Sequence, residues 1–137
     1  MQRYRKRIFG PLLDRIDMHV EVPAVPRSVL RKPDPTAESS QTVRARVVAA
    51  RACQLERQGA LNSQLQGRAL EQHCQLDEPG HALLDTAMER LHLSARSYHR
   101  ILRLARTIAD MGGSGSIEAP HIAEAVQLRC LDRRSMI

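Results

Sequence analysis

The sequence predicts an all-α protein, a small helical bundle that follows a largely irregular N-terminal segment. Only 2% of the 137 residues are aromatic and none is Trp, so the core must consist of aliphatic side chains. Beyond residue 40 the apolar residues recur at spacings of three and four, which is the period of an amphipathic helix. Both observations favour packed helices over a β-sandwich.

The first 40 residues are expected to contain two unlike pieces. Residues 1–22 hold a basic run, a Gly10-Pro11 turn and an alternating stretch from Met18 to Val22 that indicates one strand. A single strand has no partner for its backbone donors and acceptors, so we expect residues 1–40 to be mobile. Residues 23–40 contain four prolines and several hydroxyl side chains without periodicity, which is typical of a linker.

Residues 41–134 are expected to form the bundle. A helix over about 41–58 should end at Gly59 and turn Val43, Val47 and Ala50 inward, and a short helix should follow at about 67–74. The next three helices are marked by their first or last residues. They are expected to begin after Asp77, to run from Ser94 until Gly112, and to begin near Pro120 and carry Ile122, Ala125, Val126 and Cys130 inward.

Charge and cysteine content narrow the classes of function. The formal net charge is +6, from 21 Lys and Arg against 15 Asp and Glu, and such a basic chain attracts phosphate groups. Cys53, Cys74 and Cys130 are odd in number and contain no C-x-x-C pair, so we expect neither disulfides nor a metal site. Without a long apolar run, the chain is expected to be cytoplasmic and to have no membrane partner.

Arg15 is the first candidate site residue. It lies between a Gly-Pro turn and the expected strand, and a guanidinium stays charged and can donate two parallel hydrogen bonds to phosphate oxygens. Such a group can stabilise charge that develops on a transferred phosphoryl group. The alternative is that Arg15 pairs with Asp14 or Asp17 on a solvated turn.

Three further arginines lie on the helix that follows Ser94. Arg96, Arg100 and Arg103 are spaced i, i+4 and i+7, opposite the apolar stripe, and form a surface that attracts phosphate. Arg96 falls in the first turn, where unpaired backbone N–H groups already favour an anion. The alternative is an ordinary solvated helix face.

Two segments carry a resemblance to a known family. Residues 12–17, Leu-Leu-Asp-Arg-Ile-Asp, resemble the arginine-finger segment of magnesium-chelatase-like AAA+ ATPases and the related minichromosome-maintenance helicases. Residues 93–110 are very similar to the sensor-2 helix of the ComM/YifB subfamily. The resemblance implies that Arg15 is a catalytic finger acting in trans on a neighbour's ATP. It also implies that Arg96 reaches the terminal phosphate of its own ATP, with Arg100 as a weaker candidate.

The family pattern is present only in part. The sequence contains no G-x-x-x-x-G-K-[ST] motif, so the chain is expected to complete a nucleotide site but not to form one, and to be inactive alone. The resemblance implies that residues 1–22 are the tail of an AAA+ core, that 41–134 is a lid domain, and that the parent ATPase uses ATP and Mg²⁺.

The implied partners are the missing AAA+ core, neighbouring subunits of a ring homo-oligomer, and DNA. The implied work of the ring is DNA branch migration or insertion of a metal into a porphyrin, and the residues do not separate the two. The competing interpretation is a small basic helical nucleic-acid-binding domain. With two Tyr and one Phe, the chain offers little for stacking on bases.

Overall fold

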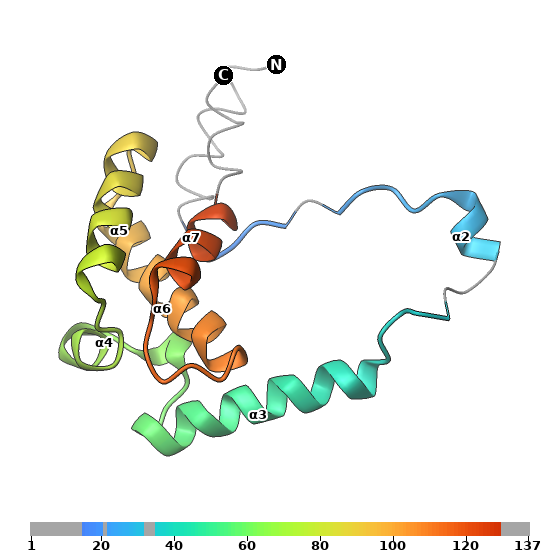
Figure 1. Cartoon of the computed structure of the whole chain (residues 1–137), viewed down its shortest axis with the longest axis horizontal. Coiled ribbons are helices and arrows are strands. Elements are labelled where there is room, and N and C mark those ends of the chain that lie inside the picture. The colour runs from blue at the N-terminus through green and yellow to red at the C-terminus, as the bar shows by residue number, and fades with distance from the viewer. Residues whose placement is uncertain (1–14, 21, 32–34, 130–137) are drawn as a thin grey trace.

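The computed structural model describes residues 15–20, 22–31 and 35–129, and within these the regular elements are helices (Figure 1). A single parallel bridge between Leu76 and Ile117 is the one sheet-like pairing in this part of the chain. The all-α prediction is therefore confirmed. The elements are α2 (Arg27–Arg31), α3 (Ser40–Gln58), the 3-10 helix η1 (Asn62–Gln64), α4 (Gly67–His73), α5 (Glu78–Leu91), α6 (Ala95–Met111) and α7 (Ala119–Gln127).

Local capping explains where the helices begin and end. The side chain of Asp77 accepts a hydrogen bond from the Gly80 amide at 2.8 Å, and Ser94 Oγ accepts one from the Ser97 amide at 3.2 Å. Gly59 ends α3 with φ +67°, a conformation that costs little without a Cβ. These predicted caps are confirmed. The sequence did not predict α2, which lies inside the expected linker.

The core lies among α5, α6 and α7. Both α5 and α6 pack against α7, and α4 and η1 pack against α6. α6 is the central element, because it also contacts α3. Its apolar stripe is buried through Ile101, Leu102, Ala105 and Ala109, as the spacing predicted. The buried core cluster further includes Leu65, Leu70, Cys74, Leu84, Ile117, Ile122 and Ala125.

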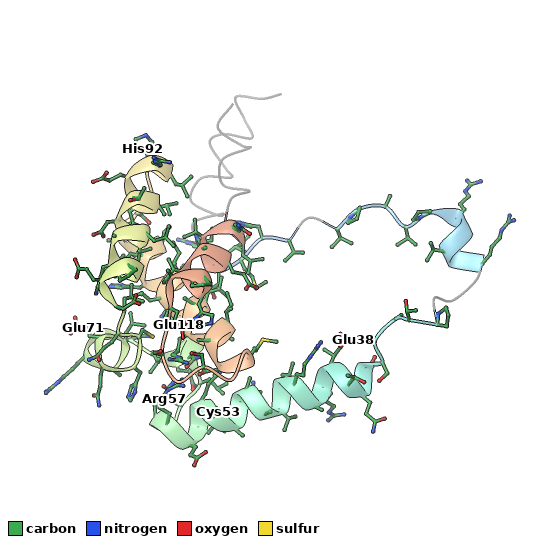
Figure 2. The ribbon with its side chains drawn as sticks, viewed as in Figure 1. Glu38, Cys53, Arg57, Glu71, His92 and Glu118 are labelled. Atoms are coloured by element: carbon green, nitrogen blue, oxygen red, sulfur yellow. The ribbon has the colours of Figure 1, made fainter. Side chains whose placement is uncertain are left out.

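The predicted inward stripe of α3 is wrong in its first half. Val43 and Val47 are 40% and 42% exposed, whereas Ala50 and Gln54 are buried. A helix of 19 residues extends roughly 28 Å, and Figure 1 shows that only its C-terminal part reaches the bundle. Figure 2 shows Glu38 at the far end of this helix and Arg57 at the end next to the bundle.

The strand expected from Met18 to Val22 is also wrong, because residues 18–20 and 22 are not in strand conformation and Glu21 lies outside the described residues. A strand requires a neighbouring strand, and this part of the chain offers none. Instead, the His19 amide donates a 2.7 Å hydrogen bond to the carbonyl of Leu128, just after α7.

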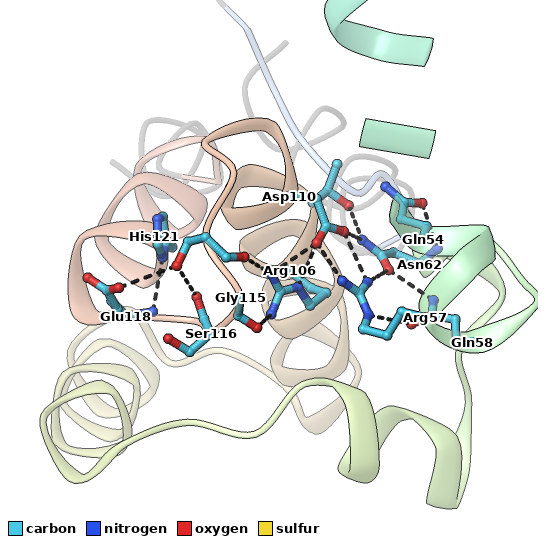
Figure 3. A network of polar contacts seen from close by, with 12 residues as sticks. Gln54, Arg57, Gln58, Asn62, Arg106, Asp110, Gly115, Ser116, Glu118 and His121 are labelled. Atoms are coloured by element: carbon cyan, nitrogen blue, oxygen red, sulfur yellow. Dashed lines mark hydrogen bonds and ion pairs between the residues drawn. The ribbon is translucent and has the colours of Figure 1, made fainter. Parts of the chain in front are cut away.

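A polar network at the C-terminal end of α6 joins this helix to α3 and η1 (Figure 3). The carboxylate of Asp110 accepts hydrogen bonds from Arg57 at 2.6 and 3.1 Å, from Asn62 at 2.8 Å and from Arg106 at 3.1 Å. Arg106 is itself buried and donates to the carbonyls of Ser114 and Gly115. The network therefore holds the end of α3, η1 and the loop after α6 against one carboxylate.

Burial alone would raise the pKa of Asp110. The hydrogen bonds from Arg57 and Asn62 and the charge of Arg106 outweigh that effect, so the pKa of Asp110 lies below its usual range. Asp110 is therefore ionised at neutral pH. Burial raises the pKa of the Cys74 thiol to about 11 in spite of the nearby arginines, so Cys74 is a protonated core residue.

Candidate functional site

Arg15 lies on an exposed turn that contacts α6. Its backbone carbonyl accepts a hydrogen bond of 2.6 Å from Nη1 of Arg100, and the same Nη1 lies 2.5 Å from Oδ1 of Asp17. The guanidinium of Arg100 therefore holds the backbone of this turn and also forms an ion pair with its carboxylate. Asp14, the other acid expected to compete for Arg15, lies outside the described residues.

Arg129 holds the same turn from the other side. This residue follows α7 and is only 1% exposed. Its Nη1 donates to the carbonyls of Ile16 at 3.0 Å and Asp17 at 3.1 Å, and its Nη2 donates to Oγ of buried Ser97 at 3.3 Å. Together with the His19 amide, these contacts fix residues 15–19, which we call the docked segment.

The docking explains how backbone groups with no strand partner are satisfied. The carbonyls of three successive residues, 15, 16 and 17, accept hydrogen bonds from the two arginines. A guanidinium suits this task because it offers five N–H donors in a fixed plane. Residues 15–19 are thus part of the bundle surface, which the sequence did not predict.

Arg96 lies in the first turn of α6 and is exposed. The side chain of Ser94 caps this turn by accepting a hydrogen bond from the Ser97 amide, and this contact fixes the start of the helix. Arg100 follows one turn later on the same face, since residues four apart in a helix are neighbours. Through Arg100, the structure therefore brings the turn that carries Arg15 next to the helix face that carries Arg96.

The predicted three-arginine face of α6 is not a uniform basic surface. Arg100 contacts the docked segment, and Nη1 of Arg103 donates to the carbonyl of Leu65 at 3.0 Å. Both side chains are partly buried. Arg96 is more exposed to solvent than the other two arginines.

Sequence analysis did not identify Arg129. A usable signal exists, because Ile122, Ala125 and Arg129 are spaced i, i+3 and i+7, so Arg129, two residues after α7, continues the inward stripe of that helix. An arginine at an inward position needs buried partners. Which partners it finds could not be read from the spacing, since the docked segment lies more than 110 positions earlier in the chain.

The described residues supply no group of three or more His, Cys, Asp and Glu side chains that could hold a metal ion. Among them Cys53 and Cys74 are free thiols, while Cys130 lies outside the described part. No helix in residues 15–20, 22–31 and 35–129 is long and apolar enough to cross a membrane.

Comparison with known families gives two matches along this chain. Residues 37–129 match the family described as "Magnesium chelatase, subunit ChlI C-terminal". Residues 1–30 match the family described as "Magnesium chelatase, subunit ChlI". Residues 31–36, between the two matched ranges, lie inside the stretch that the sequence predicted to be a linker, and the match over residues 1–30 includes Arg15.

Curated relatives are similar over almost the whole chain. It is 41% identical to "Competence protein ComM" of Haemophilus influenzae over 133 residues, which are 97% of this chain and 26% of the relative. It is 42% identical to "Uncharacterized protein YifB" of Escherichia coli over 131 residues, 96% of this chain and 26% of the relative.

A mycobacterial protein is more distant. The chain is 31% identical to "Uncharacterized protein Rv2897c" of Mycobacterium tuberculosis over 132 residues, 93% of this chain and 26% of the relative. The chain thus spans about a quarter of the length of the curated relatives it matches.

Proposed function

This chain belongs to the magnesium chelatase subunit ChlI C-terminal family, and we propose that it completes the ATP site of a magnesium-chelatase-like AAA+ ATPase. In this proposal residues 41–134 are the lid, and residues 1–22, which include the docked segment, end the ATPase core. The match of residues 1–30 to the ChlI family itself supports assigning Arg15 to the core. The P-loop would lie in a part of the ATPase other than this chain.

Arg15 is the residue that we propose to be catalytic. Phosphoryl transfer depends on positioning and on stabilising negative charge, and an arginine finger supplies a fixed positive charge at the transferred phosphoryl group. The side chain of Arg15 is exposed while its backbone is held, which suits a finger. We propose that it acts in trans, on ATP bound by a neighbouring subunit of a ring.

Arg96 is the residue that we propose to bind nucleotide. Its position in the first turn of a 17-residue helix adds a mobile charge to the positive end of the helix dipole. Arg100 is reassigned from the weaker nucleotide candidate to the support of the Arg15 turn, because its Nη1 already contacts Arg15 and Asp17.

The observation that carries the proposal is the hydrogen bond of 2.6 Å between Nη1 of Arg100 and the carbonyl of Arg15. This hydrogen bond links the turn that carries Arg15 to α6, and Arg100 lies one helical turn after Arg96 on that helix. The resemblance implied that Arg15 serves a neighbour's ATP and Arg96 its own. Because Arg15 and Arg96 lie on one surface, it is simpler for them to contact one ATP molecule than two different ones. We therefore propose that both arginines act on the neighbour's ATP.

Mg²⁺ bound with ATP would neutralise charge on the phosphate oxygens and orient them. We propose that its protein ligands lie with the P-loop, in a part of the ATPase other than this chain. The work of the ATPase is proposed to be remodelling of DNA by branch migration in the cytoplasm. The relative named "Competence protein ComM" supports a role in competence, and the net charge of +6 suits a polyanion.

The competing function, a small nucleic-acid-binding domain, is less well supported. Its support is the basic run from Arg3 to Arg7, which lies outside the described residues, and the arginine face of α6, where Arg100 and Arg103 donate to backbone carbonyls. Arg57 and Arg106 likewise serve the Asp110 network. A binding surface for a nucleic-acid backbone needs several cations directed at phosphates, and these four are engaged within the bundle.

Mixed rings test the proposal. Subunits of the whole ATPase with Arg15→Ala are combined with subunits whose P-loop lysine is replaced, and the same is done with Arg96→Ala. If both arginines serve a neighbour's ATP, each inactive pair recovers part of its ATPase activity. Recovery with Arg15→Ala alone would return Arg96 to its own subunit's ATP. Normal turnover by Arg15→Ala subunits, with no recovery in any mixture, would refute the finger.

A further inference from the structure

The docked segment depends on two cationic side chains that are far from it in the sequence. Arg100 lies on α6 and Arg129 lies two residues after α7, and the segment that they hold lies 83 to 113 positions earlier in the chain. Neither arginine is available to a ligand in the same way as Arg15, because their Nη1 atoms already have backbone acceptors.

We propose that Arg100 and Arg129 are positioning residues that join the Arg15 turn to the bundle, so that Arg15 and Arg96 move together as one surface. This inference rests on the proposed function of Arg15. It goes beyond that function by naming the residues through which movement of the helical bundle reaches the finger.

The directions of the hydrogen bonds support this role. The two arginines bind the carbonyls of residues 15, 16 and 17 and leave the side chain of Arg15 exposed. Support of this kind fixes where the finger starts without competing for the phosphate that it would contact. A displacement of about 1 Å is enough to reduce a catalytic rate strongly.

Burial makes Arg129 the stronger of the two supports. Its side chain is almost fully buried, and the docked segment provides two of its acceptors, so loss of the segment would remove partners from a buried charge. The side chain of Arg100 is 16% exposed and its carboxylate partner Asp17 is 66% exposed, so water can replace part of that contact.

Hydrogen exchange of the 137-residue chain tests the docking without any ATPase assay. The His19 amide, bonded to the Leu128 carbonyl, reports docking, and amides in the middle of α6 report folding. Arg129→Met should lower protection of the His19 amide about tenfold or more while α6 stays protected. Arg103→Met is the matched control, because Arg103 also donates to a carbonyl but not in the docked segment.

If Arg129→Met unfolds the chain, Arg100→Met provides the second variant, with a smaller loss of protection expected at His19. Unchanged protection of the His19 amide in a folded Arg129→Met, or in a folded Arg100→Met where Arg129→Met unfolds the chain, would overturn the docking role.

Turnover in the whole ATPase tests positioning. Arg129→Met should lower kcat with little change in KM for ATP, and Arg129→Lys should recover part of the loss because it keeps a buried donor. In a variant that already carries Arg15→Ala, Arg129→Met should cost no further activity, since it acts through Arg15. A full additional loss would show a merely structural role. Normal kcat of Arg15→Ala would refute the finger and leave the exchange result intact.

Discussion

The guanidinium of Arg57, at the end of α3, lies 2.6 Å from a carboxylate oxygen of Asp110 at the end of α6. The same oxygen lies 2.9 Å from Nη2 of Arg106, one turn earlier in α6. One buried carboxylate thus balances two cations that come from different helices. This arrangement fixes the C-terminal end of α3 on the bundle, whereas the rest of that helix extends away from it (Figure 1).

Replacement of this carboxylate should destabilise the chain strongly. Asp110→Asn keeps the shape of the side chain but leaves Arg106, with a side chain only 3% exposed, as a buried charge without its counter-ion. We expect a loss of about 3 kcal/mol in the free energy of unfolding, measured by urea denaturation. Asp85→Asn, on the exposed side of α5, is the control and should change it by less than about 0.5 kcal/mol. Equal effects of the two substitutions would contradict the account.

The stability that Asp110 contributes should depend on pH in one direction. Its pKa is lower in the folded than in the unfolded chain, so the unfolded state takes up the proton first as the pH falls. The difference in unfolding free energy between the wild type and Asp110→Asn should therefore be constant from pH 5 to 8. It should shrink below about pH 4, near the unfolded pKa of an aspartate. A difference that grows toward low pH would contradict the direction of this shift.

The two described cysteines should differ in their reaction with iodoacetamide. Burial raises the pKa of Cys74 to about 11, so its reactive thiolate is scarce at pH 8, whereas Cys53 is exposed on α3. Peptide mass spectrometry should find Cys53 modified in the native chain and Cys74 modified only after denaturation. Mass spectrometry follows the labelling of Cys130 separately, because Cys130 lies on a different peptide. Equal labelling of Cys53 and Cys74 in the native chain would show that the core opens readily.

Arg15 and Arg96 should affect different kinetic constants in the whole ATPase. A finger acts on charge that develops in the transition state, so Arg15→Ala should lower kcat, by as much as ~10³-fold, with KM for ATP nearly unchanged. Arg96→Ala should also raise KM, because Arg96 is proposed to bind the ground-state nucleotide. The control is Arg46→Ala, since Arg46 pairs with Glu38 at the exposed end of α3. A change in KM alone for Arg15→Ala would be incompatible with a finger.

The chain without a P-loop should bind ATP weakly. Two exposed arginines provide an attraction that salt screens, so isothermal titration of the 137-residue chain is expected to give at best a millimolar Kd. Micromolar binding at physiological salt would indicate a nucleotide site that involves other residues.

Local signals in the sequence determined most of the helices. The caps at Asp77 and Ser94 and the left-handed Gly59 depend on hydrogen bonds and dihedral angles within a few residues, so they could be predicted without the fold. The aliphatic stripe of α6 was predictable for the same reason. The exposure of Val43 was not, because it depends on how far α3 extends beyond the bundle.

The candidate site could likewise be predicted only in part from the sequence. The resemblance of residues 12–17 and 93–110 to a known family singled out Arg15 and Arg96, and side-chain chemistry agrees with it, because a guanidinium is a permanent cation that suits phosphate. Only the tertiary structure decided that Arg100 supports the Arg15 turn and that Arg129 is buried against it. These contacts join positions 85 and 113 residues apart, and no local periodicity reports which distant carbonyl a buried guanidinium will find.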